Sequence, residues 1–168
     1  METLETIRTV LAVRSYQNKP IPAQVVQAIL DAGRLTGSAM NKQPWHFIVV
    51  ENGETIQKIG ALARSGQYTA QAPLVIVVAI EEGQFALSDA SRAIQAMILA
   101  AWSEGVGSNW VGFLGMEGVK ELLGIPSQLS ILAILPFGYP AKRLGKGKKK
   151  RKALAEVAHR EKFGVPYQ

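Results

Sequence analysis

The fold is decided by one apolar stretch in the middle of the chain, Leu74-Val75-Ile76-Val77-Val78-Ala79-Ile80. A strand that faces water on one side alternates apolar and polar residues, whereas a strand covered on both sides is apolar throughout. This stretch therefore predicts a central strand that is packed on both faces. Upstream, Trp45–Val50 is rich in β-forming residues and ends at the turn-forming pair Asn52-Gly53, which indicates a second strand. Further strands are predicted over Ser108–Leu114, which continues into a turn, and over Ile131–Phe137.

Helices are predicted between and around these strands. Apolar residues recur at the i, i+3, i+4 spacing of an amphipathic helix over Thr3–Ala12 and Pro22–Leu35. Shorter helices are expected over Glu54–Ala63 and Glu117–Leu123, and a last one over Ala153–Lys162. Strands separated by helices indicate an α+β or α/β domain. We predict an α+β fold, with a mixed or antiparallel sheet wrapped by helices, as a single domain over residues 1–168.

One predicted helix, Asp89–Glu104, has almost no polar face. Ser88 is suited to cap this helix, and Asp89 suits its first turn. A helix that is apolar nearly all round is buried on several sides, and a lone domain of 168 residues provides such burial poorly. We therefore expect this helix to form a subunit interface in a homodimer.

Composition excludes several classes of site. The chain has 168 residues and no cysteine, which removes disulfides, thiolate nucleophiles, zinc–thiolate sites and cysteine-ligated iron–sulfur clusters. Met1–Val13 lacks the basic start and unbroken apolar core of a signal peptide. The longest apolar run, Ala72–Ile80, is about half as long as a membrane span. We expect a soluble cytoplasmic protein with no membrane partner.

The positive charge of the chain is concentrated in one segment. The net charge is +6, from 19 basic and 13 acidic residues. Eight of the basic residues lie between Lys142 and Lys152, and without them 11 basic residues face 13 acidic ones. We therefore expect the protein to meet an anion at this basic segment.

Several familiar catalytic motifs are absent from the sequence. Gly105, Gly107 and Gly112 do not have the spacing of a dinucleotide-binding turn, and they follow a helix instead of a strand. His46 and His159 lie far apart without a ligand cluster, so no metal site is predicted, and His46 is interpreted as a structural histidine. No Ser–His–acid set can be assembled. An enzyme with so few nucleophiles and proton-transfer groups would depend on a cofactor for its chemistry.

Three segments stand out together. The first is Val13-Arg14-Ser15-Tyr16-Gln17-Asn18-Lys19-Pro20-Ile21, in which an arginine follows a predicted helix. The second is Gly37–Val50, a polar loop that contains Asn41-Lys42-Gln43-Pro44-Trp45 and continues into the predicted strand. The third is Gly138-Tyr139-Pro140, with Lys149-Lys150-Arg151-Lys152 after it. With Asp89–Met97 and Gly105–Gly112 between them, and in this order, these segments resemble the FMN-dependent nitroreductase family from Ile7 to about Gly164.

The resemblance implies roles for eight residues in binding FMN. Arg14 matches a basic position that contacts the flavin phosphate and ribityl region. Ser38, Asn41 and Gln43 match a loop that lines the flavin, where the two amides can hydrogen-bond ring or ribityl groups. Val111 and Gly112 match a backbone segment beside the reactive edge of the ring, and a glycine lets the main chain approach closely. Lys149 and Arg151 match C-terminal cations that hold the phosphate.

The sequence departs from the family at one place. Many members carry an Arg-Arg-Ser or Arg-His-Ser stretch before the first basic residue, where this chain has Val10-Leu11-Ala12. One phosphate-binding arginine and one ribityl-binding serine are therefore missing. We hypothesise that the cations near the C-terminus compensate for this loss.

The resemblance also implies an assembly and a reaction. It implies a homodimer with two FMN molecules, each in a groove at the subunit interface. NAD(P)H would give a hydride to the flavin, and a nitroaromatic, a quinone or another small oxidised acceptor would then take the electrons. Because one pocket would serve both partners, we expect ping-pong kinetics. No side chain stands out as a catalytic acid or base.

Two alternatives stay open. Flavoproteins of the same fold also dehalogenate, dehydrogenate or cleave the flavin, and the range of acceptors would distinguish these reactions. Alternatively, Lys142–Lys152 is a nucleic-acid-binding arm on a non-catalytic domain. This arm lacks the interleaved aromatic residues of a single-strand binder, so nucleic acid is the less favoured partner. Steeply salt-dependent binding to DNA or RNA would support it.

Overall fold

A computed structural model describes residues 2–112, 116–142, 144 and 149–167 of the chain. The predicted Leu114, and Arg143, Lys146 and Lys148 of the basic segment, lie outside the described residues. The helices are α1 (Thr3–Thr9), α2 (Ala23–Arg34), α3 (Gly53–Leu62), α4 (Ala86–Ser103), α5 (Met116–Leu122) and α6 (Leu154–Val157), with 3-10 turns η1 (Ala39–Asn41) and η2 (Gln67–Gln71). The strands are β1 (Trp45–Val50), β2 (Leu74–Ile80), β3 (Gly107–Ser108) and β4 (Ser130–Gly138). The α+β fold is therefore confirmed.

The four strands form one sheet in the order β1-β2-β4-β3. All three strand pairs are antiparallel, so the sheet is antiparallel and not mixed. β2 lies between β1 and β4, and six of its seven residues are buried. The prediction of a central strand covered on both faces is confirmed.

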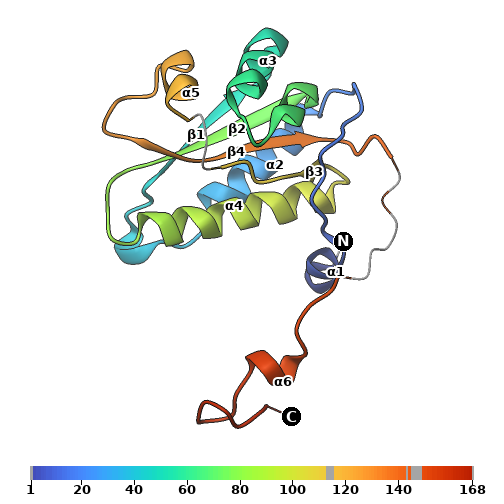
Figure 1. Ribbon diagram of the computed structural model, residues 1–168, viewed down its shortest axis with the longest axis vertical. Helices are drawn as coiled ribbons and strands as arrows, with labels where there is room; N and C mark the ends of the chain where they lie inside the picture. The colour runs from blue at the N-terminus through green and yellow to red at the C-terminus, as the bar shows by residue number, and fades with distance from the viewer. Residues whose placement is uncertain (1, 113–115, 143, 145–148, 168) are drawn as a thin grey trace.

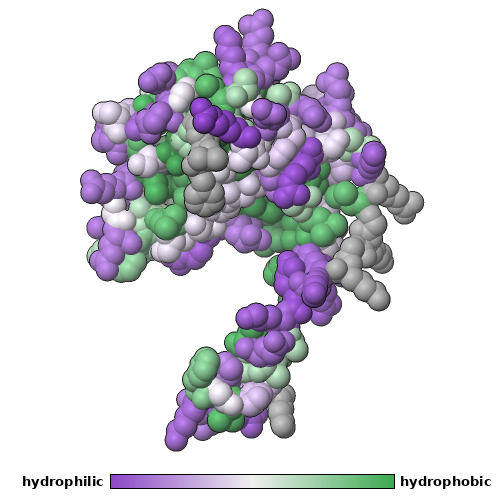
Figure 2. Space-filling view, viewed as in Figure 1, coloured by the Kyte–Doolittle hydropathy of each residue, from purple (hydrophilic) through white to green (hydrophobic). Residues whose placement is uncertain are grey.

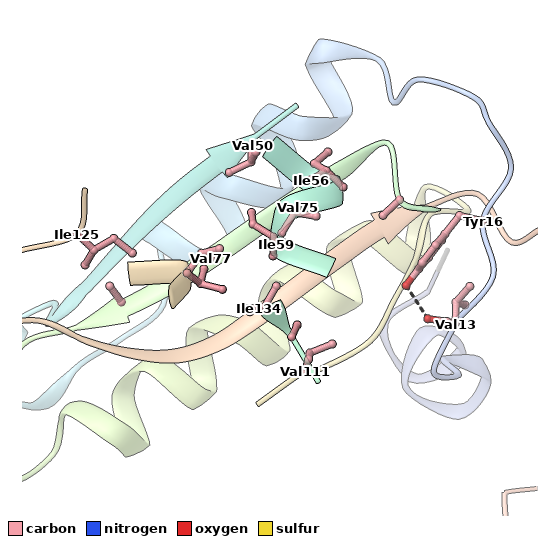
Figure 3. Close-up of a cluster of buried hydrophobic side chains, with 14 residues drawn as sticks. Val13, Tyr16, Val50, Ile56, Ile59, Val75, Val77, Val111, Ile125 and Ile134 are labelled. Atoms are coloured by element: carbon pink, nitrogen blue, oxygen red, sulfur yellow. Dashed lines mark hydrogen bonds between the residues drawn. The ribbon is translucent and has the colours of Figure 1, made fainter. Parts of the chain in front are cut away.

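Successive residues of β2 enter two different hydrophobic cores because side chains alternate across a strand. Val75 and Val77 pack with residues of α3, α5 and β4 in one core, part of which is drawn in Figure 3. Ile76 and Val78 pack in the other core with residues of α2 and α4. The sheet therefore separates α3 and α5 on one side from α2 and α4 on the other (Figure 1).

The segment after α1 lies against β3. The Val13 amide donates to the Ser108 carbonyl at 2.9 Å, and the Tyr16 hydroxyl donates to the Val13 carbonyl at 2.6 Å (Figure 3). Burial, reinforced by the neighbouring Tyr68, raises the pKa of Tyr16 and keeps this donor protonated. A Cβ at Gly107 would lie 2.2 Å from Val13 Cγ2, so glycine permits this close packing. α1 consequently ends at Thr9 and does not reach the predicted Ala12.

The long helix α4 begins earlier than predicted. It starts at Ala86, so Ser88 lies inside it and does not cap it; the Ser88 hydroxyl donates to the Phe85 carbonyl at 3.0 Å. The helix buries seven side chains. Arg92 and Gln95 are exposed, however, so the helix is not buried all round within its own chain in the way that its apolar sequence suggests. In the described part of the chain, neither α4 nor any other helix has the length and hydropathy that crossing a membrane requires.

The C-terminal arm, residues 149–167, extends away from the rest of the molecule (Figure 1). It exposes apolar side chains, visible in Figure 2, among them Leu154 at 64% and Phe163 at 92% exposure. The predicted helix Ala153–Lys162 is wrong beyond its first turn, since α6 covers only Leu154–Val157. A short helix is marginal without a surface to pack on, and the arm has little such contact within its own chain.

Candidate functional site

A cavity of about 680 Å³ lies between α1, α4, the start of the arm and residues 108–110. Three cations line it, Arg8, Lys149 and Arg151, and no described carboxylate does. Its other lining residues are apolar or neutral and polar: Ile7, Val10, Leu11, Ala12, Gln95, Ile98, Ser108, Asn109 and Trp110. The volume is that of a site for a cofactor-sized molecule. We call it the cationic pocket.

Lys149 is fixed at the edge of this pocket. Its ammonium group donates to the Ile7 carbonyl at 2.7 Å, which joins the arm to the end of α1. Burial, and then the positive charge of Arg151, lower the pKa of Lys149. A bound anion would offset both effects, because opposite charge favours the protonated amine. The arrangement of charges therefore suits a ligand with a phosphate or carboxylate group.

The segment that departs from the family, Val10-Leu11-Ala12, forms an apolar wall of the same pocket. Its position follows from the pairing of residues 12 and 13 with Ser108. Trp110 and Ile98 add further apolar surface. The pocket thus combines a charged region with apolar walls, as a molecule with a flat ring system and an anionic group requires.

The loop with Ser38, Asn41 and Gln43 is held in an unusual conformation. Met40, Asn41 and Gln43 have positive φ angles of 53°, 53° and 50°. The Ser38 hydroxyl accepts from the Gln43 amide at 2.9 Å, and the Gln43 side chain donates to Asn41 Oδ1 at 3.2 Å. Non-glycine residues keep such angles only where the surroundings enforce them. The three predicted site residues are therefore brought together, in a preorganised and largely exposed loop.

Asp89 attaches this loop to α4. Its side chain is 1% exposed, and Oδ2 accepts from the Ala39 amide at 3.0 Å while Oδ1 accepts from Arg92. The predicted placement of Asp89 in the first turn of the helix is confirmed. Its contact with Ala39 spans 50 positions and could not be read from the sequence.

Within one chain the loop and the cationic pocket are separate. The loop meets α4 at Asp89, whereas the pocket meets it at Gln95 and Ile98. At about 1.5 Å per helical residue these points lie roughly 9–14 Å apart along the axis. Arg14 does not line the pocket either; its charge acts on the nearby Tyr16. Of the predicted residues, only Lys149 and Arg151 line the pocket.

Val111 and Gly112 follow the pocket residue Trp110. The Val111 amide and carbonyl both bond to Ile134, at 2.9 and 2.8 Å, and the Val111 side chain is buried. Val111 therefore anchors the segment to β4. A Cβ at Gly112 would lie 3.1 Å from Trp110 Nε1, so the indole already packs closely on this glycine.

The sequence reasoning missed further polar residues around the pocket. Asn109 lines it and donates to the Tyr68 hydroxyl, and Gln95 lines it from α4. Arg8 was also missed. It lies just before Val10–Ala12, where the sequence departs from the family, and a cation at this place could have been noticed in the sequence. Tyr68 gave no such signal, since it reaches Asn109 across 41 positions.

His46 has the structural setting that the sequence predicts. It lies on β1, and its Nε2 is 3.2 Å from Glu81 Oε1. Its side chain is 49% exposed, because β1 pairs only with β2 among the described strands.

Comparisons with known proteins agree on one family. The model of the Nitroreductase family matches residues 8–87 and 65–139. A provisionally named NADH dehydrogenase/NAD(P)H nitroreductase of Methanothermobacter thermautotrophicus is 36% identical, over 86% of this chain and 81% of that protein. The FMN reductase [NAD(P)H] of Bacillus subtilis is 26% identical, over 96% and 74% of the two chains. A crystal structure from Bacteroides thetaiotaomicron, with the same provisional name as the first relative, superposes with a TM-score of 0.87 at 28% identity, over 96% and 98% of the two chains.

Proposed function

The chain belongs to the nitroreductase family, and from that premise we propose that it is an NAD(P)H-dependent oxidoreductase that binds FMN in the cationic pocket. Bound FMN would supply the redox chemistry, taking a hydride from NAD(P)H and passing electrons to a small oxidised acceptor such as a nitroaromatic or a quinone. The relative named FMN reductase [NAD(P)H] supports this cofactor and this reductant.

The observation that carries the proposal is the pocket itself. Three cations without a described carboxylate, beside apolar walls, match the two parts of FMN, an anionic phosphate and a flat ring. Burial, and then the positive charge of Arg151, lower the pKa of Lys149, and a bound phosphate would offset both effects. The residues present therefore fit the cofactor.

Each group of residues has a distinct task in this proposal. Lys149 and Arg151 hold the phosphate through charge-assisted hydrogen bonds. Leu11 and Trp110 exclude water from the ring and orient it. Asn109 donates to the Tyr68 hydroxyl, which positions its side-chain amide to hydrogen-bond polar atoms of the ring. No described carboxylate or histidine of the same chain lines the pocket; the residues that do line it bind and orient the cofactor.

We propose further that the site is completed in a homodimer. Ser38, Asn41 and Gln43 lie away from the cationic pocket of their own chain, and the arm exposes apolar residues that no described part of that chain covers. A second copy would bury the arm and bring its own loop to the pocket. Sedimentation equilibrium is expected to give the mass of two chains; a monomer that binds FMN tightly would contradict the shared site.

The proposal predicts a yellow protein. After loading with FMN and desalting, the unmodified chain is expected to show the two visible bands of oxidised flavin, and anaerobic NADH or NADPH should bleach them. Lys149→Gln/Arg151→Gln should weaken FMN binding roughly 30-fold, at about 1 kcal/mol for each partly solvated contact. Fluorescence titration of FMN measures this loss.

A control double variant distinguishes the loss of positive charge at the pocket from the same loss of charge elsewhere in the protein. Lys58→Gln/Lys120→Gln removes two charges from α3 and α5, on the other side of the sheet (Figure 1), and should leave FMN binding unchanged. An unmodified protein that stays colourless after loading would refute the proposed function. Equal losses in both double variants would show that the pocket has no special part in binding.

A further inference from the structure

We propose that Arg8 is a third phosphate-binding residue, which takes over the task that the apolar Val10-Leu11-Ala12 segment cannot perform. This inference rests on the proposed function. Arg8 lies outside the sequence motif, in the last turn of α1, and lines the cationic pocket.

The first support is position. Arg8 lies in the last turn of α1 and lines the cationic pocket together with Lys149 and Arg151. The bond from Lys149 to the carbonyl of Ile7, the residue just before Arg8, places the two basic segments side by side although 142 positions separate them. The cations therefore converge from both ends of the chain.

The second support is that Arg8 forms no ion pair with any residue that the structure describes. The three ion pairs among the described residues involve Arg34, His46 and Arg92, and not Arg8. A cation at a helix C-terminus is favourable by itself, so this position alone would not imply a ligand. The convergence with Lys149 and Arg151, in a pocket without a described carboxylate, is what assigns Arg8 to an anion.

The third support is that the side chains of Val10–Ala12 cannot bind a phosphate. These side chains line the pocket but carry no charge and no hydrogen-bonding group. A dianionic phosphate needs more positive charge than a singly charged anion does, and arginine offers several donors in a planar fork. Arg8 supplies this charge from two residues before Val10.

The test compares FMN with riboflavin, which has the same ring and ribityl chain without the phosphate. Flavin fluorescence quenching gives both affinities for the full-length protein. Arg8→Gln is expected to weaken FMN binding about fivefold and to leave riboflavin binding unchanged. Arg8→Lys, which keeps the charge, should retain most of the FMN affinity. Lys58→Gln, which removes one charge on α3, should change neither.

The outcomes separate this assignment from the proposed function. If the unmodified protein prefers FMN over riboflavin and Arg8→Gln retains that preference, the assignment to Arg8 is wrong while the proposed function stands. If Arg8→Gln weakens both flavins equally, Arg8 supports the fold of the pocket and not the phosphate. If the unmodified protein binds neither flavin, the proposed function falls, and the assignment to Arg8 with it. Circular dichroism melts show whether each variant keeps its fold.

Discussion

Replacing Asp89 with alanine is expected to lower the free energy of unfolding by about 2–3 kcal/mol and to release the loop of residues 38–43. The carboxylate is buried and accepts from the Ala39 amide at 3.0 Å and from Arg92. Hydrogen bonds to charged groups are worth about 1.5–3 kcal/mol when the partner is left unsatisfied. Met40, Asn41 and Gln43 then lose the tether that helps to hold their positive φ angles.

Urea unfolding measures the stability, and hydrogen exchange of the amides of residues 39–43 measures the release of the loop. Asp89→Asn is the matched control, since it keeps one acceptor, for Ala39, while it loses the charge and the acceptor for Arg92; it should cost about 1 kcal/mol. If the loop carries flavin contacts, Asp89→Ala also weakens FMN binding, and reduced quenching of flavin fluorescence reports the loss. Unchanged exchange at residues 39–43 in Asp89→Ala would show that the loop holds its shape without this carboxylate.

A methyl group at Gly66 is expected to destabilise the protein by about 2–3 kcal/mol, within the range known for overpacked cores. A Cβ there would lie 2.4 Å from Val111 Cγ1 and 2.7 Å from Cγ2. Val111 cannot yield easily, because its side chain is β-branched and its amide and carbonyl both bond to Ile134. The strain would pass along the chain to Gly112 and to Trp110, of which Trp110 lines the cationic pocket.

Gly37→Ala is the control for Gly66→Ala. No atom lies within 4 Å of the Cβ position at Gly37, and this residue does not have a positive φ angle, so alanine should be neutral or slightly stabilising. Thermal and urea melts of both variants give the comparison. Equal stabilities of Gly66→Ala and the unmodified protein would mean that the η2 turn shifts freely relative to Val111.

The local structure could largely be predicted from the sequence. Leu74–Ile80 and Trp45–Val50 are strands with the predicted bounds, because an apolar run or a β-rich run between turn residues has few other stable forms. The last predicted helix was wrong because helical periodicity is only a weak signal without a surface to pack on. Ser88 was a suitable cap, but helix α4 continues past it to Ala86.

The candidate site was only partly predictable. The order of its motifs indicated the nitroreductase family, and the family model and the relatives confirm it. Composition likewise located the positive charge near the C-terminus. The roles of Arg14, Ser38, Asn41 and Gln43 stay predictions, as do those of Val111, Gly112, Lys149 and Arg151.

By itself, then, the sequence determined β1, β2 and β4, most of the helices and the location of excess charge, because each of these depends on residues near one another in the chain. The predicted strand Ser108–Leu114 was wrong beyond Ser108, because β3 covers only Gly107–Ser108 among the described residues. The family followed from the order of several such local segments. Only the tertiary structure decided that Lys149 lies against Ile7 and that Asp89 holds Ala39, across 142 and 50 positions. It also decided that Arg8 shares a pocket with Arg151. Such contacts depend on how the sheet and α4 bring distant segments together, and the packing that does so leaves no periodic trace in the sequence.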